Sequence, residues 1–157
     1  MNTEIIADSG SQNIWIKRRF AADQELVYQL FVEKDLQLQW QSAYLANFKF
    51  LHFDCTTGGS YYSTHTGPDG ITYGFIGIYH ELVPNKRIVK TSEFLGLPFK
   101  VLPTLEVLSF EEQEGQVLLS IQIICDSVVT RDAMVQHGMQ THFYDIFFVI
   151  DKLILNK

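Results

Sequence analysis

The sequence predicts an α+β domain in which a curved antiparallel sheet wraps around one long C-terminal helix. From residue 48 to residue 125, apolar side chains follow a period of two between tight turns, which is typical of a meander of strands. From residue 130 to residue 155, they recur in steps of three and four, which makes one face of a helix. This stripe consists of Met139, Phe143, Ile146, Ile150 and Leu153. A lone long helix must bury its stripe against the sheet, and we expect room for a cavity between them.

The chain opens with a polar leader and a first strand. Residues 1–12 are mostly polar, and we expect this leader to fray because unpacked chain ends are poorly ordered. Residues 13–20 place Ile14 and Ile16 on one face, as expected for a strand. We therefore predict that a single domain covers residues 13–157.

Two short helices are expected after the first strand. Asp23 and Glu25 open the first, because acidic side chains favour the positive end of a helix dipole. The second begins at Asp35 and turns Leu36 and Trp40 inward. Both are short enough to support the sheet rather than form a domain of their own.

Turn signals divide the following segment into about six strands. The expected strands cover residues 48–54, 60–66, 72–82, 87–93, 105–110 and 117–125. The sequence Gly67-Pro68-Asp69-Gly70 is a strong hairpin signal, because proline presets φ and glycine permits a positive φ. With the first strand, this makes a sheet of about seven antiparallel strands, and no internal repeat divides it.

The final helix has its own start signal. Thr130 is a suitable N-cap, and Asp132 favours the positive end of the helix dipole. Gly138 lies inside the expected helix, where glycine costs about 1 kcal/mol relative to alanine. We therefore expect Gly138 to make a close contact with a neighbouring strand; the alternative is that it lets backbone or a ligand approach near the cavity mouth.

The composition fits one well-cored domain and argues against a nucleic-acid partner. Twelve Phe and seven Tyr in 157 residues either fill a Phe-rich core or line a cavity. The formal net charge is −6, and no basic cluster exceeds Lys17-Arg18-Arg19. Phosphate backbones are bound by basic patches, which this chain lacks.

The sequence also predicts a cytoplasmic protein without a membrane span. The first 13 residues contain no apolar run typical of a secretion signal. No apolar run approaches the roughly 20 residues that cross a bilayer. Cys55 and Cys125 fit no metal-binding spacing, and we expect both thiols to be reduced.

Several short motifs, in their order and spacing, resemble one family. They are Arg19-Phe20-Ala21-Ala22, Glu25-Leu26-Val27-Tyr28, Trp40, Asp54 with Gly58-Gly59 and Tyr61, Pro68-Asp69-Gly70, residues 77–84 with Arg87-Ile88-Val89 and Thr91, Arg131-Asp132-Ala133-Met134 and Gly138-Met139. The family is the activator of heat-shock-protein-90 ATPase homologue-like group of the START (SRPBCC) superfamily, which is related to the birch-pollen allergen fold. The resemblance covers nearly the whole chain from residue 13.

The resemblance implies a helix-grip fold, START-like, with an internal cavity. It implies little about activity, since the superfamily includes lipid carriers, aromatic cyclases, hormone receptors and co-chaperones. The chain departs from the family pattern at Thr56, where a basic residue is frequent, and at His142, where glycine is frequent. The His142 side chain is therefore an addition near the expected cavity.

The candidate ligand-binding residues are aromatic, His and Met side chains whose spacing along their strand or helix allows them to face the interior of the domain. They are Trp40, Phe48, Phe50, Tyr61, His65, Phe75, Met139 and Phe143. Tyr61, Ser63 and His65 share one strand face, where they could orient a polar ligand head or act in acid–base chemistry. The alternative for His65 is a solvated side chain near the hairpin tip. The sequence does not set the register of the hairpin, so the facing of Phe75 stays open.

The sequence predicts no catalytic nucleophile, no metal site and no cofactor. Cys55 lies three residues from His52, a spacing that puts them on opposite faces of a strand. No serine has the context of a nucleophile elbow. His137 and His142 are five residues apart, so on a helix they point in different directions.

An unusually apolar connection suggests either a lid or a subunit contact. Residues 94–103 carry six apolar side chains, whereas loops are normally polar. Phe148 and Leu155 also widen the apolar surface of the last helix. We therefore expect a homodimer with the loop or the last helix at its interface. The alternative is a monomer in which the loop folds back as a lid over the cavity.

Three functions are compatible with these observations. The favoured one is a protein that binds a small hydrophobic or amphipathic molecule in the cavity. The second is a protein-interaction module that acts on a chaperone ATPase, and the third is a cyclase or dehydratase that uses Tyr61 and His65. A cavity of a few hundred Å³ favours the first or third, whereas a solid core with a large apolar patch favours the second.

Overall fold

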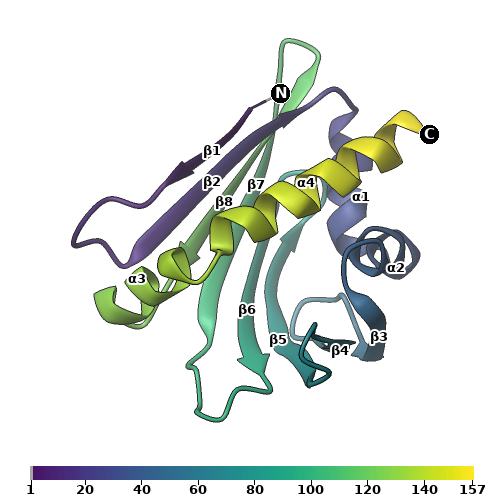
Figure 1. Cartoon of the computed structure of the whole chain (residues 1–157). Helices are drawn as coiled ribbons and strands as arrows, with labels where there is room; N and C mark the ends of the chain where they lie inside the picture. The colour runs from purple at the N-terminus through teal and green to yellow at the C-terminus, as the bar shows by residue number, and fades with distance from the viewer. Residues whose placement is uncertain (1) are drawn as a thin grey trace.

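The computed structural model describes residues 2–157, which form one eight-stranded antiparallel sheet and four helices (Figure 1). The strands are β1 (Thr3–Ile6), β2 (Asn13–Phe20), β3 (Ala46–Phe53), β4 (Ser60–Thr66), β5 (Thr72–Val83), β6 (Arg87–Leu95), β7 (Thr104–Gln113) and β8 (Gln116–Ile124). The helices are α1 (Gln24–Val32), α2 (Lys34–Ser42), α3 (Val128–Gln136) and α4 (Met139–Leu155). The predicted α+β helix-grip architecture is confirmed, with eight strands instead of about seven.

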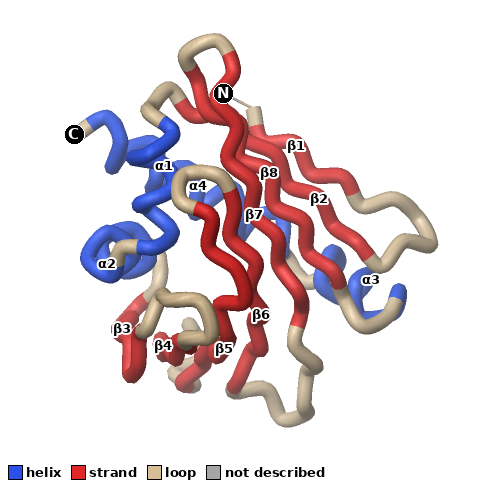
Figure 2. Tube along the Cα trace, turned by 180° about the vertical axis from the view of Figure 1, so that it is seen from behind, coloured by secondary structure: helices blue, strands red, loops and turns tan. Residues whose placement is uncertain are grey.

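The strands are ordered β1-β2-β8-β7-β6-β5-β4-β3 across the sheet. From β3 to β8 each strand pairs with its neighbour in sequence, and β2 then pairs with β8. Figure 2 shows the outer face of the sheet, with α4 passing behind the strands and α1 and α2 beside them at the left. The helices therefore cover one face of the sheet, and any enclosed site must lie on that side.

The core forms where α4 lies against the inner face of the sheet. Residues alternate between buried and less buried along β2 and β8, as the period-two pattern requires. Ile146 and Ile150 of the predicted helix stripe are 6% and 0% exposed. Arg18 of β2 forms an ion pair with Asp151 of α4, which ties the helix to the strand near its C-terminal end.

The N-terminal leader is not frayed where the structure describes it. Thr3–Ile6 pairs with β2 as the edge strand β1, with Ile5 opposite Ile16. Ile5 packs against the core, and the Arg18 guanidinium donates to the Thr3 hydroxyl at 3.1 Å. These contacts order a segment whose polar composition predicted disorder, and Met1 lies outside the described residues.

The single helix predicted for residues 130–155 is two helices, α3 and α4. The break lies at Gly138, whose φ of +89° is in the left-handed region that favours glycine. A Cβ at this position would meet nothing within 4 Å, so the expected close contact with a strand is wrong. The start of α3 also differs, because Ser127 is its N-cap and accepts a hydrogen bond from the Thr130 amide at 3.1 Å.

The break at Gly138 leads to a stability prediction. Replacing Gly138 by alanine introduces no steric clash but places a Cβ on a left-handed residue, which costs about 1 kcal/mol or more. Gly138→Asn is the matched control, because asparagine tolerates this conformation better. Urea denaturation should therefore rank the free energy of unfolding as parent, then Gly138→Asn, then Gly138→Ala. A Gly138→Ala protein as stable as the parent would show that the break has another cause.

Candidate functional site

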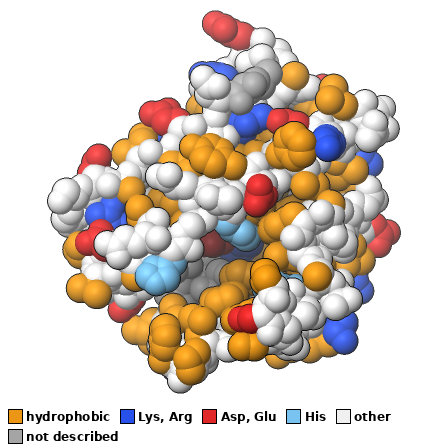
Figure 3. Space-filling view, in the orientation of Figure 1, with side chains coloured by type: hydrophobic (Ala, Val, Ile, Leu, Met, Phe, Trp, Pro, Cys, Tyr) orange, Lys and Arg blue, Asp and Glu red, His pale blue; other side chains and the backbone are white. Residues whose placement is uncertain are grey.

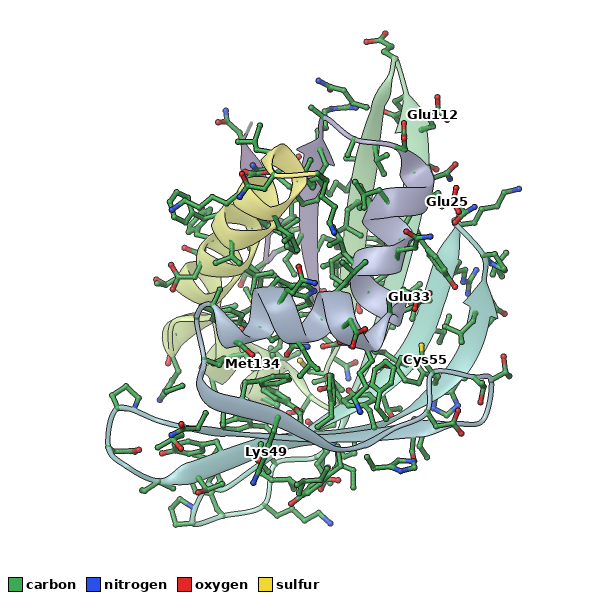
Figure 4. The ribbon with its side chains drawn as sticks, turned by 90° about the vertical axis from the view of Figure 1, so that its right-hand side faces the viewer. Glu25, Glu33, Lys49, Cys55, Glu112 and Met134 are labelled. Atoms are coloured by element: carbon green, nitrogen blue, oxygen red, sulfur yellow. The ribbon has the colours of Figure 1, made fainter. Side chains whose placement is uncertain are left out.

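A partly enclosed cavity of about 130 Å³ lies between the inner face of the sheet and α4. Its wall is formed by residues of helices α1, α2 and α4 and of strands β3 to β8. Figure 3 shows the surface hollowed on the face that carries α4, with hydrophobic side chains around the hollow. Figure 4 shows side chains from α2 and from the strands opposite it filling the space between them.

Aromatic rings make most of the apolar wall. Phe31 and Trp40 come from the two short helices, and their ring centroids are 5.8 Å apart. Phe143 and Phe147 come from α4, with centroids 5.9 Å apart. The indole N–H of Trp40 donates to the carbonyl of Leu30 at 2.7 Å, so this ring is fixed in orientation. The wall is therefore suited to the apolar part of a ligand.

A partly buried ion pair interrupts this apolar wall. The Lys90 ammonium lies 3.6 Å from the Glu106 carboxylate, and the two residues are direct partners in the β6–β7 register. Both side chains line the cavity and keep only 24% and 20% of their surface exposed. The same cross-strand row runs on to Tyr79 on one side and Ile123 on the other, each 2% exposed. Two charges thus occupy the middle of an otherwise buried row.

The surroundings of Lys90 keep it charged. Burial works against the charge, but the neighbouring acidic groups Tyr61, Glu106 and Tyr79 outweigh it and raise the pKa of Lys90. Of these three groups, the Glu106 carboxylate is the one that is charged at neutral pH. Its ammonium lies 5.2 Å from the centroid of the Tyr61 ring, a cation–π distance. Lys90 is therefore a permanent hydrogen-bond donor and not an amine nucleophile, which would need a lowered pKa.

Tyr61 is held in place by a close approach to the backbone. Its hydroxyl donates to the carbonyl oxygen of Thr91 at 2.9 Å, and its ring lies over Gly77. A Cβ on Gly77 would lie 2.0 Å from the Thr91 oxygen and 2.6 Å from the Tyr61 hydroxyl. Burial raises the pKa of Tyr61, so the phenol stays protonated and its proton is engaged by Thr91.

His142 lines the cavity from α4, as its place in the family pattern suggested. Its ring packs edge-on against Tyr44, with centroids 5.6 Å apart, and lies 5.7 Å from Phe143. Burial lowers the pKa of His142, so the imidazole is neutral at neutral pH. The contact with Tyr44 joins α4 to the turn between α2 and β3.

Five of the eight predicted ligand-binding residues line the cavity. They are Trp40, Phe50, Tyr61, Phe75 and Phe143. Phe48 and Met139 are buried outside the cavity wall, and Phe48 packs against the Phe50 ring at 5.2 Å. A register shift in β3 between Ala46 and Lys49 accompanies this placement of Phe48. Ligand binding by these residues stays a prediction.

His65 lies neither in the cavity wall nor in solvent. It is 8% exposed, so the expectation of a solvated side chain is wrong. Its ring stacks on Tyr73 and Phe75 at 6.0 Å each, and burial lowers its pKa. Because the Tyr61 hydroxyl is bound to Thr91 and His65 lies outside the wall, the two do not meet as an acid–base pair.

The two charged residues of the cavity, Lys90 and Glu106, were not predicted from the sequence, although the sequence holds a signal for them. Lys90 shares a strand face with Ile88, and Glu106 shares one with Leu108, two residues that are 0% and 3% exposed. A charged residue on the apolar face of two strands indicates a polar site. The register that pairs them could not be read from the sequence.

The described residues offer neither a metal centre nor a membrane span. Within residues 2–157, no group of three or more His, Cys, Asp or Glu side chains could hold a metal ion. No helix in the same range is long and apolar enough to cross a membrane. Cys55 and Cys125 are both free thiols.

Comparisons with known proteins agree with this fold. The sequence model of one family, described as Activator of Hsp90 ATPase homolog 1-like protein, matches residues 21–154. A comparison with curated proteins finds no match. Similar solved structures include protein Ms6760 from Mycobacterium smegmatis, with a TM-score of 0.85, 17% identity and coverage of 97% of this chain and 96% of that one.

Two further solved structures are also similar to this chain in fold. A protein from Rhodobacter sphaeroides has a TM-score of 0.81 and 22% identity over 99% of each chain. A protein from Arthrobacter aurescens has a TM-score of 0.84 and 18% identity over 98% of this chain and 92% of that one. At these identities the likeness shows the shared fold alone.

Proposed function

Because the chain belongs to the family of Activator of Hsp90 ATPase homolog 1-like proteins, we propose that it uses the helix-grip fold to bind a small hydrophobic or amphipathic molecule. The ligand occupies the cavity between the sheet and α4. The observation that carries this proposal is the Lys90–Glu106 pair in an aromatic wall.

The ion pair is better explained by recognition than by stability. Removing two charges from water costs free energy that their attraction often fails to recover, and apolar replacements of such pairs are frequently neutral or stabilising. A ligand group that both donates and accepts hydrogen bonds can use Lys90 as donor and Glu106 as acceptor. A hydroxyl or amide has this property, whereas a bare anion would meet the Glu106 charge. We therefore expect a neutral polar group at this end of the ligand.

The size of the cavity limits what it can hold without rearrangement. Its volume of about 130 Å³ is close to that of an engineered cavity that binds benzene, which is about 150 Å³. It is smaller than the roughly 300–1,000 Å³ typical of pockets for larger ligands. A single ring with one polar substituent is therefore the part of a ligand that fits here.

Phenol and toluene test this proposal, because they differ only by a hydroxyl in place of a methyl group. In an NMR titration of the labelled protein, we expect phenol to shift amides of β6 and β7 and to bind about tenfold more tightly than toluene. The double variant Lys90→Met/Glu106→Leu should lose this preference. Lys49→Met is the matched control, since Lys49 is exposed and points away from the helices (Figure 4), and it should keep the preference.

Two results would contradict the proposal. Phenol that leaves the cavity amides unshifted would exclude binding at this site. Phenol that binds the double variant as tightly as the parent would exclude the ion pair as its anchor.

The two alternative functions receive less support. Action on a chaperone ATPase, which the family description names, would use an exposed surface, and Leu51, Ile76 and Ile78 are 54%, 38% and 45% exposed. That function leaves the charged cavity unexplained. A cyclase-type mechanism needs Tyr61 and His65 in the same cavity, but Tyr61 lines the cavity and His65 does not.

We also propose a cytoplasmic homodimer. Cytoplasmic conditions would keep the free thiols of Cys55 and Cys125 reduced. Phe99 and Leu102, in the loop between β6 and β7, are 66% and 50% exposed, which suits a contact between two copies.

Light scattering at micromolar concentration tests the dimer. We expect a mass of twice the 18.1 kDa chain, and Phe99→Glu should lower it toward that of one chain, because a buried carboxylate would oppose the contact. A parent protein with the mass of a single chain would exclude the dimer.

A further inference from the structure

A second and larger pocket lies on the other side of the cavity wall. It is a groove of about 440 Å³ between α2 and α4. Ala43, Val149 and Leu153 form its apolar part together with Phe148, which is 61% exposed. Its volume falls in the range of about 300–1,000 Å³ that is typical of ligand pockets, which the inner cavity does not reach.

Two aromatic side chains separate the groove from the cavity. Trp40 and Tyr44 line both pockets, and their rings stack with an interplanar angle of 2° and a centroid separation of 6.2 Å. The partition between the two spaces is thus one pair of rings.

The two rings of this partition are held differently. Trp40 is 6% exposed and is fixed by its hydrogen bond to the Leu30 carbonyl. Tyr44 follows α2 in the turn before β3 and is held by ring contacts to Trp40 and His142. A rotation of the Tyr44 side chain would break its ring contacts and its packing against the core, whereas moving Trp40 would also leave a buried carbonyl unsatisfied.

We propose that the cavity and the groove are two halves of one binding site, with Tyr44 as the gate between them. The ligand class is a molecule with a ring-sized polar head in the cavity and an apolar tail in the groove. This inference rests on the proposed function above, because the head binds at Lys90 and Glu106.

The groove suits a neutral tail more than a charged one. Ala43, Val149 and Leu153 give its lining an aliphatic part, while Asp145 and Lys152 supply opposite charges. The Lys152 ammonium lies 4.3 Å from the centroid of the Phe148 ring, so this charge is already paired with an aromatic face. An alkyl chain would cover Val149 and Leu153 without leaving a charge unpaired.

A series of phenols with alkyl chains at the para position tests this inference, because the para position points the tail away from the hydroxyl. Phenol, 4-butylphenol and 4-hexylphenol are titrated by calorimetry. Each methylene that becomes buried should raise the affinity about three- to fourfold. The measured quantity is the affinity ratio of 4-hexylphenol to phenol.

Two variants separate the groove from general hydrophobic binding. Ala43→Trp fills the groove from an exposed position and should remove most of the gain that the tail provides. Thr141→Trp is the matched control, because Thr141 is exposed on α4 and lines neither pocket, and it should keep the gain. Tyr44→Ala should raise the association rate of 4-hexylphenol by at least tenfold while changing that of phenol less.

The outcomes distinguish this inference from the proposed function. If phenol shifts the cavity amides but the tail adds no affinity, or Ala43→Trp keeps the gain, the inference is wrong and the proposed function stands. If 4-hexylphenol binds the double variant Lys90→Met/Glu106→Leu as tightly as the parent, the groove is a separate site and the inference is also wrong. If Ala43→Trp instead converts a dimer to a monomer and keeps the gain, a second copy occupies the groove and the inference is overturned.

Discussion

The apolar stripe of α4 must lie against the inner face of the sheet, and the rest of the molecule follows from this constraint. Ile146 and Ile150 of this stripe are buried against the sheet. The ion pair between Arg18 of β2 and Asp151 of α4 also holds the helix to the sheet. Where the curved sheet departs from the straight helix, a space remains, and aromatic side chains from α1, α2 and α4 narrow it to about 130 Å³. The packing that stabilises the fold thus also creates the cavity.

The same constraint places the charged side chains of Lys90 and Glu106 among apolar neighbours, at positions where apolar residues are usual. They sit at the centre of a cross-strand row that is otherwise buried, and Tyr61 and Tyr79 surround the ammonium. The local pattern therefore breaks the rule that core positions are apolar, and such breaks are expected at functional sites. We proposed the polar head of the ligand because this pair can bind it, and the place where the head binds determines where the tail lies.

Elements with strong periodicity could be predicted from the sequence, whereas features set by tertiary contacts could not. β4 was predicted with its observed bounds, because turn residues flank it on both sides. β1 was missed because its order depends on pairing with β2, and the break at Gly138 was missed because the apolar period continues across it. Five cavity residues were found from aromatic spacing, but Lys90 and Glu106 required the register of β6 and β7.

The most direct test of this account is the free energy of unfolding of the double variant Lys90→Met/Glu106→Leu, measured by urea denaturation at neutral pH. Both charges are removed together, and the new side chains occupy similar volume, so no buried charge is left unpaired. The account predicts a free energy of unfolding within about 1 kcal/mol of the parent, or higher. A loss of several kcal/mol would contradict it, because the pair would then serve the stability of the fold rather than the recognition of a ligand.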